Sequence, residues 1–295
     1  MTQHRSAFPE SGASATAADP DTTHFGYRTV RAAEKAGMVR GVFDSVASRY
    51  DLMNDLMSGG VHRLWKDSFV AQVAPRPGMV CLDVGGGTGD IAFRLMDQMT
   101  KRAEARARQR ARMSGADADG DTAPITVPSA GGGRVMVCDI NANMISVGRD
   151  RALDRGMVDG LDWMVGDAEK LPIEDDSVDV YTIAFCLRNV TRIDAALAEA
   201  RRVLKPGGRF FCLEFSKVVL PGFDKLYDAY SFSVLPTLGQ FVAGDRESYE
   251  YLAESIRRFP SQRELCQRMS AAGLQRARHR NLSAGIAAVH SGVRL

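Results

Sequence analysis

The sequence predicts an α/β fold built on a doubly wound, mostly parallel sheet, and three observations predict it. Short apolar, β-branched runs alternate with helical patterns through the middle of the chain. Each run is too short for a buried helix and is bounded by Gly, Pro or Asp. A glycine-rich turn follows the first run, as in sheets that hold a ligand at the start of a helix. The expected strands are residues 79–84, 134–140, 161–165, 178–185 and 209–215.

Two helical patterns precede the first strand. Residues 32–50 predict a helix, and the apolar pattern after it stops at Gly59-Gly60. A second helix is expected from Val61 onwards. The residues expected on the buried faces of this region are Leu52, Met53, Leu56, Met57, Val61, Leu64, Trp65 and Phe69.

The C-terminal part is expected to complete the sheet. The helix before the fifth strand starts with Thr191 and Asp194 at capping-box spacing and ends at Pro206-Gly207-Gly208. A later helix ends at Gly273, and residues 276–295 predict a closing antiparallel hairpin.

The composition is that of an ordinary globular protein, with 45% hydrophobic and 25% charged residues. A net charge of +2 gives no indication of a nucleic-acid partner. The five cysteines form no CxxC pair and no histidine lies at metal-ligand spacing, so a reducing cytoplasm, no disulfide and no metal are expected. No apolar run reaches the roughly 18 residues that span a bilayer.

The chain divides into a short leader and one domain. Residues 1–22 are rich in Ser, Ala, Pro and Asp and predict a disordered leader, and residues 23–295 predict a single domain. Residues 217–260 are expected to form a helical cover over the substrate. Residues 100–133 interrupt the pattern, with six Lys/Arg among residues 101–112 against one Glu. An exposed helix followed by a flexible loop is the ordinary interpretation, and a basic surface for anionic lipid headgroups is the functional one.

The turn "DVGGGTGD" indicates a nucleotide-like ligand. Glycine at Gly85 lets the backbone take a positive φ and approach the ligand without a Cβ in the way. The helix that follows offers free N–H groups. A P-loop is excluded because no Gly-Lys-Ser/Thr follows, but "GTGDIA" also fits a dinucleotide turn.

Three features downstream decide between S-adenosylmethionine and NAD, and together they favour S-adenosylmethionine. Asp139 closes the second strand, where a carboxylate would accept the ribose hydroxyls of either cofactor. Asp167-Ala168 follows the third strand, where the adenine amino group would be read. The entry "LKPGG" into the fifth strand is common in S-adenosylmethionine methyltransferases and unusual in dehydrogenases. Each aspartate alone could also be a loop-end cap.

Several longer motifs carry a closer resemblance. These are "THFGYRTV", "VFDSVASRYDLMNDLMSGGVHRLWK", "DVGGGTGD", "LRNVTRIDAAL", "RVLKPGGRFFCLEFSK", "YDAYSFSVLP", "SYEYLAESIRRFP" and "NLSAGIAAVHSG". Together they resemble the ubiquinone/menaquinone biosynthesis C-methyltransferase family from about Thr23 to Leu295, outside residues 100–133. The resemblance implies a class I, Rossmann-like methyltransferase fold and methyl transfer from S-adenosylmethionine to a ring carbon of 2-polyprenyl-6-methoxy-1,4-benzoquinol, demethylmenaquinol or both.

The resemblance also implies the cofactor contacts. They are Thr88 in the glycine turn, Asp139 at the ribose, and Asp167 with Ala168 near the adenine. The chain departs from the family pattern in having Asp167 where Asn is frequent. It also has "TIAFCLRNV" where "TISFGLRNV" is common, so a hydroxyl contact with the cofactor is expected to be lost or replaced.

The chemistry requires a phenol proton to leave so that a ring carbon becomes nucleophilic. Arg188 in "LRNV" follows the fourth strand at the carboxyl edge of the sheet and is the candidate catalytic residue. It would orient a water or stabilise a phenolate, and an ion pair with a nearby carboxylate is the alternative. Other candidates are Tyr50, Asp51, His62, Asp228 and Tyr230, with Tyr227, Tyr230, Phe232 and Leu235 as an isoprenoid tunnel. A structural role is the expectation for His62.

A polyprenylated quinol as substrate suggests a peripheral contact with the inner face of the membrane or with a quinone-synthesis complex. Two other functions stay open: a nicotinamide-dependent oxidoreductase, because of "GTGDIA", and a non-catalytic scaffold, because of the basic insertion and Ala184. The choice between ubiquinol and menaquinol precursors, and the oligomeric state, are not predicted.

Overall fold

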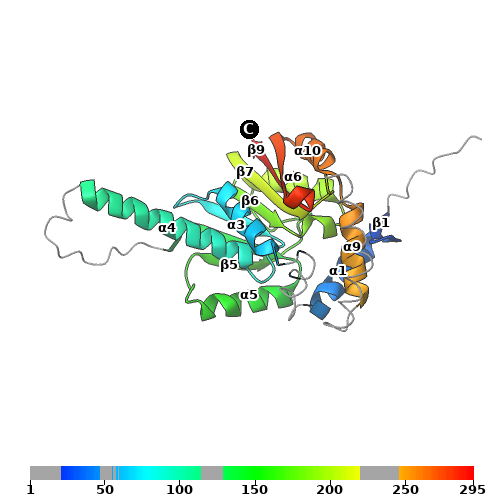
Figure 1. Cartoon of the computed structure of the whole chain (residues 1–295). Coiled ribbons are helices and arrows are strands. Elements are labelled where there is room, and N and C mark those ends of the chain that lie inside the picture. The colour runs from blue at the N-terminus through cyan, green and yellow to red at the C-terminus, as the bar shows by residue number, and fades with distance from the viewer. Residues whose placement is uncertain (1–20, 47–54, 56–57, 59, 114–128, 220–245) are drawn as a thin grey trace, which may run out of the picture.

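A seven-stranded sheet runs through the molecule (Figure 1). The computed structural model describes residues 21–46, 55, 58, 60–113, 129–219 and 246–295. In spatial order the strands are β5 (Leu161–Val165), β4 (Arg134–Asp139), β3 (Val80–Val84), β6 (Val178–Ala184), β7 (Leu204–Phe215), β9 (Ala287–Arg294) and β8 (Leu274–Leu282).

The strand pairing confirms the prediction. Neighbours from β5 to β7 are parallel, whereas β9 pairs antiparallel with both β7 and β8. The five predicted strands and the closing hairpin are therefore present. β7 starts at Leu204, so the Pro206-Gly207-Gly208 segment, which was expected to end the helix and lead into the strand, lies within the strand.

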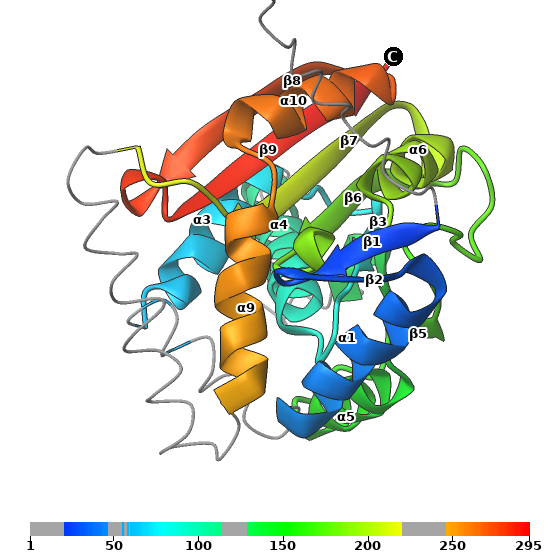
Figure 2. The ribbon, with the colours of Figure 1, turned by 90° about the vertical axis from the view of Figure 1, so that its right-hand side faces the viewer.

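Helices cover both faces of the sheet, as a doubly wound fold requires (Figure 2). One face packs against α3 (His62–Val73), α4 (Asp90–Met113) and α5 (Ala142–Asp154), and the other against α6 (Ile193–Val203) and α10 (Gln262–Ala271). The two buried clusters alternate along each strand, because successive side chains point to opposite faces. In β3, for example, Cys81 belongs to the first cluster and Leu82 to the second.

Most of the remaining elements lie at the carboxyl end of the parallel strands. They are β1 (Thr22–Phe25), β2 (Arg28–Arg31), α1 (Ala32–Val46) and α9 (Arg246–Arg258), with short 3₁₀ turns η3 (Leu187–Asn189) and η5 (Ser283–Gly285). A further 3₁₀ turn, η2 (Ser129–Gly132), lies at the opposite end, before β4. The β1–β2 hairpin was not predicted. It docks on α9, where the Tyr27 N–H donates to Glu254 at 2.9 Å and the Phe25 ring stacks on Tyr251 with centroids 4.0 Å apart.

Two local predictions are wrong. Leu64 was expected in the core but is 67% exposed, because the buried stripe of α3 passes through Trp65, Phe69 and Val73 and one residue is about 100° off that stripe. The capping box of Thr191 and Asp194 is also absent. The helix begins at Ile193 instead, and a carboxylate from another loop, Glu169, accepts the N–H of Arg192 at 2.8 Å.

Several predictions lie outside the described residues. These are the leader up to residue 20, the helical face at 52–57, the loop 114–128 and residues 220–245 of the expected cover. Of that cover, α9 is helical as expected. In the part of the chain that the structure describes, no helix is both long enough and apolar enough to cross a membrane. All five cysteines are described and all are free thiols.

Candidate functional site

The glycine turn joins β3 to α4 at the position where the strand order of the sheet reverses. Gly85 has φ +61°, and a Cβ there would lie 2.2 Å from the Cys186 Sγ. Gly87 has φ +52° and donates its N–H to the Asp139 Oδ2 at 2.9 Å. The backbone therefore needs glycine both for its conformation and for its close approach to the neighbouring loops.

A cleft of about 820 Å³, measured out to its open mouth, lies beside this turn. Four of the predicted site residues line it, namely Gly85, Asp139, Asp167 and Ala168. They come from the ends of three neighbouring parallel strands, which meet at one edge of the sheet. The opposite wall is α1, which contributes Ala36, Val39 and Arg40.

Asp139 is held between two backbone donors. Its Oδ2 accepts from Gly87 at 2.9 Å, and its Oδ1 accepts from the Asn141 N–H at 2.8 Å. Burial raises the pKa of its carboxyl, and the backbone hydrogen bonds from Asn141 and Gly87 oppose that rise. Each oxygen keeps a lone pair for a further donor. A carboxylate held rigidly in this way fits the predicted role of binding hydroxyl groups.

Asp167 both caps a turn and lines the cleft. Its Oδ1 accepts the N–H of Glu169 at 2.9 Å, which is the loop-capping role that sequence alone left open. The same residue lines the cleft beside the buried Ala168. Glu169, which was not predicted, also lines the cleft and anchors Arg192 through a 2.7 Å ion pair.

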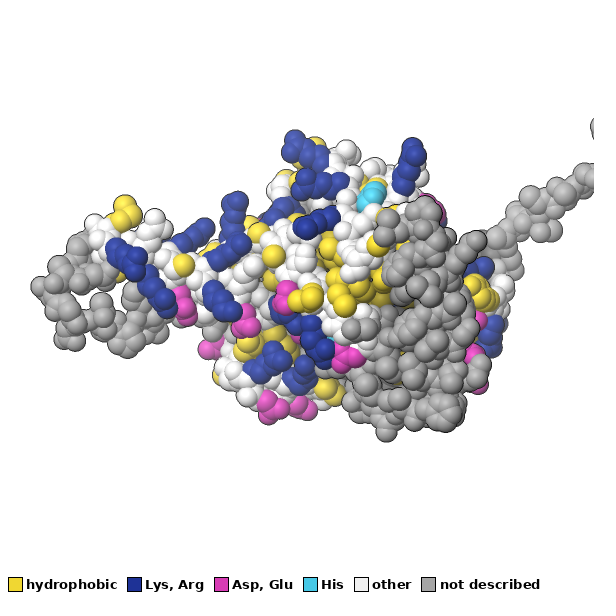
Figure 3. Space-filling model, in the orientation of Figure 1, with side chains coloured by type: hydrophobic (Ala, Val, Ile, Leu, Met, Phe, Trp, Pro, Cys, Tyr) yellow, Lys and Arg dark blue, Asp and Glu magenta, His cyan; other side chains and the backbone are white. Residues whose placement is uncertain are grey.

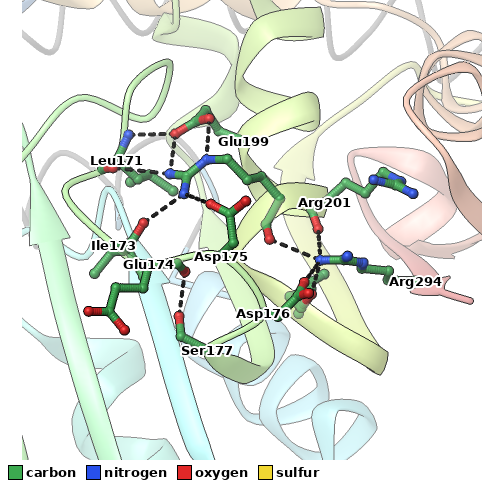
Figure 4. A network of polar contacts seen from close by, with 11 residues as sticks. Leu171, Ile173, Glu174, Asp175, Asp176, Ser177, Glu199, Arg201 and Arg294 are labelled. Atoms are coloured by element: carbon green, nitrogen blue, oxygen red, sulfur yellow. Dashed lines mark hydrogen bonds and ion pairs between the residues drawn. The ribbon is translucent and has the colours of Figure 1, made fainter.

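A polar network holds the chain just beyond this loop (Figure 4). The Arg202 guanidinium pairs with Glu199 and Asp175 and donates to the carbonyl oxygens of Leu171 and Ile173. Glu199 in turn accepts the N–H of Leu171 at 2.8 Å. The segment that follows Asp167 and Ala168 is therefore tied to α6, which fixes the cleft wall from behind.

A second cavity of about 420 Å³ adjoins the cleft and shares Gly85, Gly87 and Phe185 with it. Thr88, the fifth predicted cofactor residue, lines this cavity. Its Oγ1 accepts from the Arg151 Nη1 at 2.7 Å, so the hydroxyl is oriented by α5. The sequence showed no signal for this contact, because the two residues are 63 positions apart.

The second cavity is strongly charged. Lys66 is buried and pairs with Asp90 at 2.7 Å. Burial raises the pKa of Asp90, but Lys66 and Arg94 outweigh this effect and hold the pKa below its ordinary value. Burial raises the pKa of Asp83 to about 7, although the Thr182 hydroxyl donates to its Oδ1 at 2.7 Å. Lys66 was not predicted, since its burial depends on where α3 packs.

Arg188 does not line the cleft among the described residues, and its guanidinium is engaged elsewhere. Its Nη1 donates to the Glu214 Oε1 at 2.7 Å and to the Phe185 carbonyl oxygen at 2.6 Å. Both charged side chains are almost completely buried, and burial raises the pKa of Glu214 while Arg188 opposes that rise. The ion pair that was the alternative for Arg188 is therefore present.

The neighbouring Asn189 does line the cleft, although it was not chosen from the sequence. Tyr251 on α9 donates its hydroxyl to the Asn189 Oδ1 at 3.0 Å, which orients the amide. Cys186, one of the departures from the family pattern, also lines the cleft, and burial raises the pKa of its thiol. The Cys186 thiol in this wall of the cleft is therefore neutral. Ala184, the other departure from the family pattern, lines the second cavity.

The other candidates divide into two groups. His62 is buried and hydrogen-bonded to Ser58, with 3.1 Å between the Nδ1 and the Oγ, which confirms its structural role. Tyr50, Asp51, Tyr227, Asp228, Tyr230, Phe232 and Leu235 lie outside the described residues.

Comparisons with known proteins agree with this geometry. The model of the ubiE/COQ5 methyltransferase family matches residues 29–294. The 2-methoxy-6-polyprenyl-1,4-benzoquinol methylase of Rattus norvegicus mitochondria is 52% identical over 277 residues, which cover 92% of this chain and 84% of the relative. The ubiquinone/menaquinone biosynthesis C-methyltransferase of Paracoccus denitrificans is 52% identical over 277 residues, covering 94% and 98%.

Solved structures show the same fold. A methyltransferase from Thermotoga maritima that depends on S-adenosylmethionine matches with a TM-score of 0.53 at 16% identity, over 86% of this chain and 99% of its own. Another from Aquifex aeolicus matches with a TM-score of 0.50 at 16% identity, over 78% and 89%.

The sheet order, the glycine turn and the acidic strand ends are those of the class I fold of S-adenosylmethionine-dependent methyltransferases. The family match and the named relatives make the chain a methyltransferase of this class rather than a nicotinamide-dependent oxidoreductase or a non-catalytic scaffold. Within that class, the chain belongs to the ubiE/COQ5 methyltransferase family.

The residues present fit the cofactor. Several buried polar atoms have no hydrogen-bond partner within the described ranges, and two of them belong to residues that line these cavities. The Asp83 Oδ2 is an acceptor in the second cavity, where a cationic group would pair with it. The Asn189 Nδ2 is a donor in the cleft. Buried groups of this kind are costly unless a ligand satisfies them.

Proposed function

We propose that this chain methylates a ring carbon of a polyprenylated benzoquinol, of demethylmenaquinol, or of both. The observation that carries the proposal is 52% identity over 84% of a relative named as a 2-methoxy-6-polyprenyl-1,4-benzoquinol methylase and over 98% of one named as a ubiquinone/menaquinone biosynthesis C-methyltransferase. The methyl donor is S-adenosylmethionine, which supplies an electrophilic methyl group on a sulfonium when bound.

The cleft residues divide the work of holding the cofactor. Asp139 would bind the ribose hydroxyls, and Asp167 with Ala168 would bind the adenine. Gly85 lets the backbone approach, and Thr88 with Asp83 would line the end that holds the amino acid part. Rigid positioning of donor and acceptor supplies about 7–11 kcal/mol of barrier reduction in favourable cases.

Arg188 is proposed to act on the acceptor side. Arg188 precedes Asn189 in η3, at the carboxyl end of β6, and its charge is paired with that of Glu214. Acting through Asn189, the guanidinium end of this pair would favour the phenolate that makes the ring carbon nucleophilic. The test is the pH profile of kcat/KM. We expect Arg188→Gln to shift its acidic limb to higher pH in a protein that still binds S-adenosylhomocysteine, and an unshifted limb would contradict this role.

The substrate class is tested directly. The full chain is incubated with S-adenosylmethionine labelled in its methyl group and with a demethylated quinol kept reduced. We expect the label on a ring carbon of the benzoquinol, of demethylmenaquinol, or of both, and the ratio of kcat/KM values ranks the two acceptors. Failure of both quinols to accept the label, with cofactor binding intact, would overturn the proposal.

A substrate with a polyprenyl tail dissolves in a bilayer, so we also propose that the protein works at a membrane surface. Its relatives include both mitochondrial and bacterial proteins. Cytoplasmic location stays a prediction.

A further inference from the structure

The C-terminal half of α4 projects from the body of the molecule (Figure 1). We call residues 101–113 the basic arm. A 24-residue helix is about 36 Å long, which carries the arm beyond the edge of the sheet. Ala103 is buried against η2, but every residue after it is half-exposed or exposed, and Met113 at the end is 81% exposed.

The charges of the arm are dense and largely of one sign. Arg102, Arg106 and Arg110 are spaced by four residues, so they form one stripe along the helix. Like charges at this spacing destabilise a helix. The acid of the arm, Glu104, pairs with Arg108 at 3.4 Å. Within the described ranges, no carboxylate lies within 4 Å of Arg106 or Arg110.

The stripe continues onto the body. Arg102 donates to the Pro75 carbonyl oxygen at 3.0 Å, which places it beside the exposed Arg76. Arg209 on β7 is half-buried, and its pKa is lowered first by this burial and then by the positive charges of Arg76 and Arg102 near it. We call these five arginines, 76, 102, 106, 110 and 209, the basic face. Figure 3 shows Lys and Arg side chains along the arm and over the neighbouring part of the body.

We propose that the basic face docks on a membrane surface that contains anionic phospholipids. The proposal rests on the proposed function, because a polyprenylated quinol is reached from a bilayer. Charge complementarity favours this occupant, since each Lys or Arg near an anionic bilayer contributes about a fivefold gain in binding. A net charge of only +2 on the whole chain means that this positive charge is local and is balanced elsewhere.

The basic face and the cofactor cleft occupy different parts of α4. The cleft and its adjoining cavity lie at the first turn of the helix, beside Asp90, whereas the arm is its last half. Docking through the arm therefore leaves the cofactor residues unchanged. Its expected effect is on access to a substrate that is dissolved in the bilayer, not on the chemical step.

The test is vesicle flotation with the full chain. The vesicles consist of phosphatidylcholine alone or of phosphatidylcholine mixed with phosphatidylglycerol. We expect binding only to the anionic vesicles and loss of binding at high salt. The triple variant Arg76→Gln, Arg106→Gln, Arg110→Gln should bind them about a hundredfold more weakly, at about fivefold for each charge.

A matched control removes the same charge elsewhere. Arg31, Arg149 and Arg263 are also exposed, and their triple Gln variant should bind within about fivefold of the unmodified protein. Equal weakening by the two triple variants, or equal binding to neutral vesicles, would overturn the proposal. Tighter binding to an RNA or DNA duplex than to anionic vesicles would overturn it in favour of nucleic acid.

Activity separates this inference from the proposed function. With a short-chain quinol in solution, the triple variant Arg76→Gln, Arg106→Gln, Arg110→Gln should keep the kcat and KM of the unmodified protein. With a long-chain quinol in anionic vesicles, its apparent KM should rise at least tenfold. Vesicle binding without methyl transfer to any quinol would overturn the proposed function and leave this inference standing. Methyl transfer to a quinol without binding to anionic vesicles would overturn this inference and leave the proposed function standing.

Discussion

At the scale of single residues, we expect Asp83 to control how cofactor binding depends on pH. Burial raises the pKa of its carboxyl to about 7, so this carboxyl keeps its proton below that pH in the free protein. A cationic ligand favours the ionised form, so binding below pH 7 must release the proton. We expect the Kd for S-adenosylmethionine to rise about tenfold per pH unit as the pH falls from 7 to 5.5, measured by calorimetry.

The matched control is Asp83→Asn, which keeps the hydrogen bond from Thr182 and cannot ionise. In this variant binding should be weaker at pH 7, with a higher Kd. The Kd should also be nearly independent of pH between pH 7 and 5.5. A pH dependence that is as steep in the variant as in the unmodified protein would contradict the role given to Asp83.

The ion pair between Arg188 and Glu214 is the second residue-scale prediction. Removing one partner leaves a buried charge, so Arg188→Met should lower the free energy of unfolding by about 3–5 kcal/mol. The double variant Arg188→Met, Glu214→Leu should lose much less than the sum of the two single changes. Denaturant unfolding measures all three variants, and simple additivity would show that the pair is not coupled.

At the scale of elements, strand ends were predictable and helix ends less so. The β3, β4 and β5 runs are short and have Gly or Asp at their ends or directly after them, and these ends line the cleft. The start of α6 was missed because its first free N–H is satisfied by Glu169, which is 23 residues away. Local capping patterns cannot report such a contact.

The network in Figure 4 yields a prediction about one cleft wall. Arg202→Met removes its bonds to Glu199, Asp175 and two carbonyl oxygens, and should lower the free energy of unfolding by about 2–3 kcal/mol. It should also weaken S-adenosylhomocysteine binding about tenfold (about 1.4 kcal/mol), because the segment after Ala168 loosens. Calorimetry measures both quantities.

Arg201 offers the control for this experiment. It is the next residue on α6, and it enters the network through its backbone carbonyl, which accepts from Arg294 at 3.0 Å. Arg201→Met should therefore change the free energy of unfolding by no more than about 0.5 kcal/mol. Equal effects of the two changes would show that the network does not support the cleft.

At the scale of the whole molecule, cofactor binding should stabilise the fold. The cleft joins α1, the glycine turn, η3 and the loop after β5, so a ligand there connects elements from distant parts of the sequence. At a concentration of 100 Kd, S-adenosylhomocysteine should add about 2.7 kcal/mol to the free energy of unfolding. Thermal unfolding should show a higher Tm with the ligand than without it, and Asp139→Ala should abolish this increase. An equal increase with NAD would contradict the assignment.

Much of this fold was predictable because parallel α/β sheets have strong local signals. Alternating apolar runs and helices defined the sheet, and the chemistry of strand ends placed Asp139 and Asp167. The β1–β2 hairpin was missed because two four-residue strands carry too little pattern. The second cavity was missed because Lys66 reaches it from α3, and because the Thr88 hydroxyl in it is oriented by Arg151 from α5.

The sequence by itself determined the mostly parallel sheet with its closing hairpin and the edge at which the cofactor residues gather, because parallel strands present their carboxyl ends together. It also determined that a dense basic segment follows the first turns of α4. Only the tertiary structure decided which charges are buried and paired. Arg188 pairs with Glu214, which is 26 residues away in the chain, and Asp83 is buried beside the glycine turn. Neither could be predicted, because burial depends on the elements packed around a side chain rather than on its neighbours in the chain.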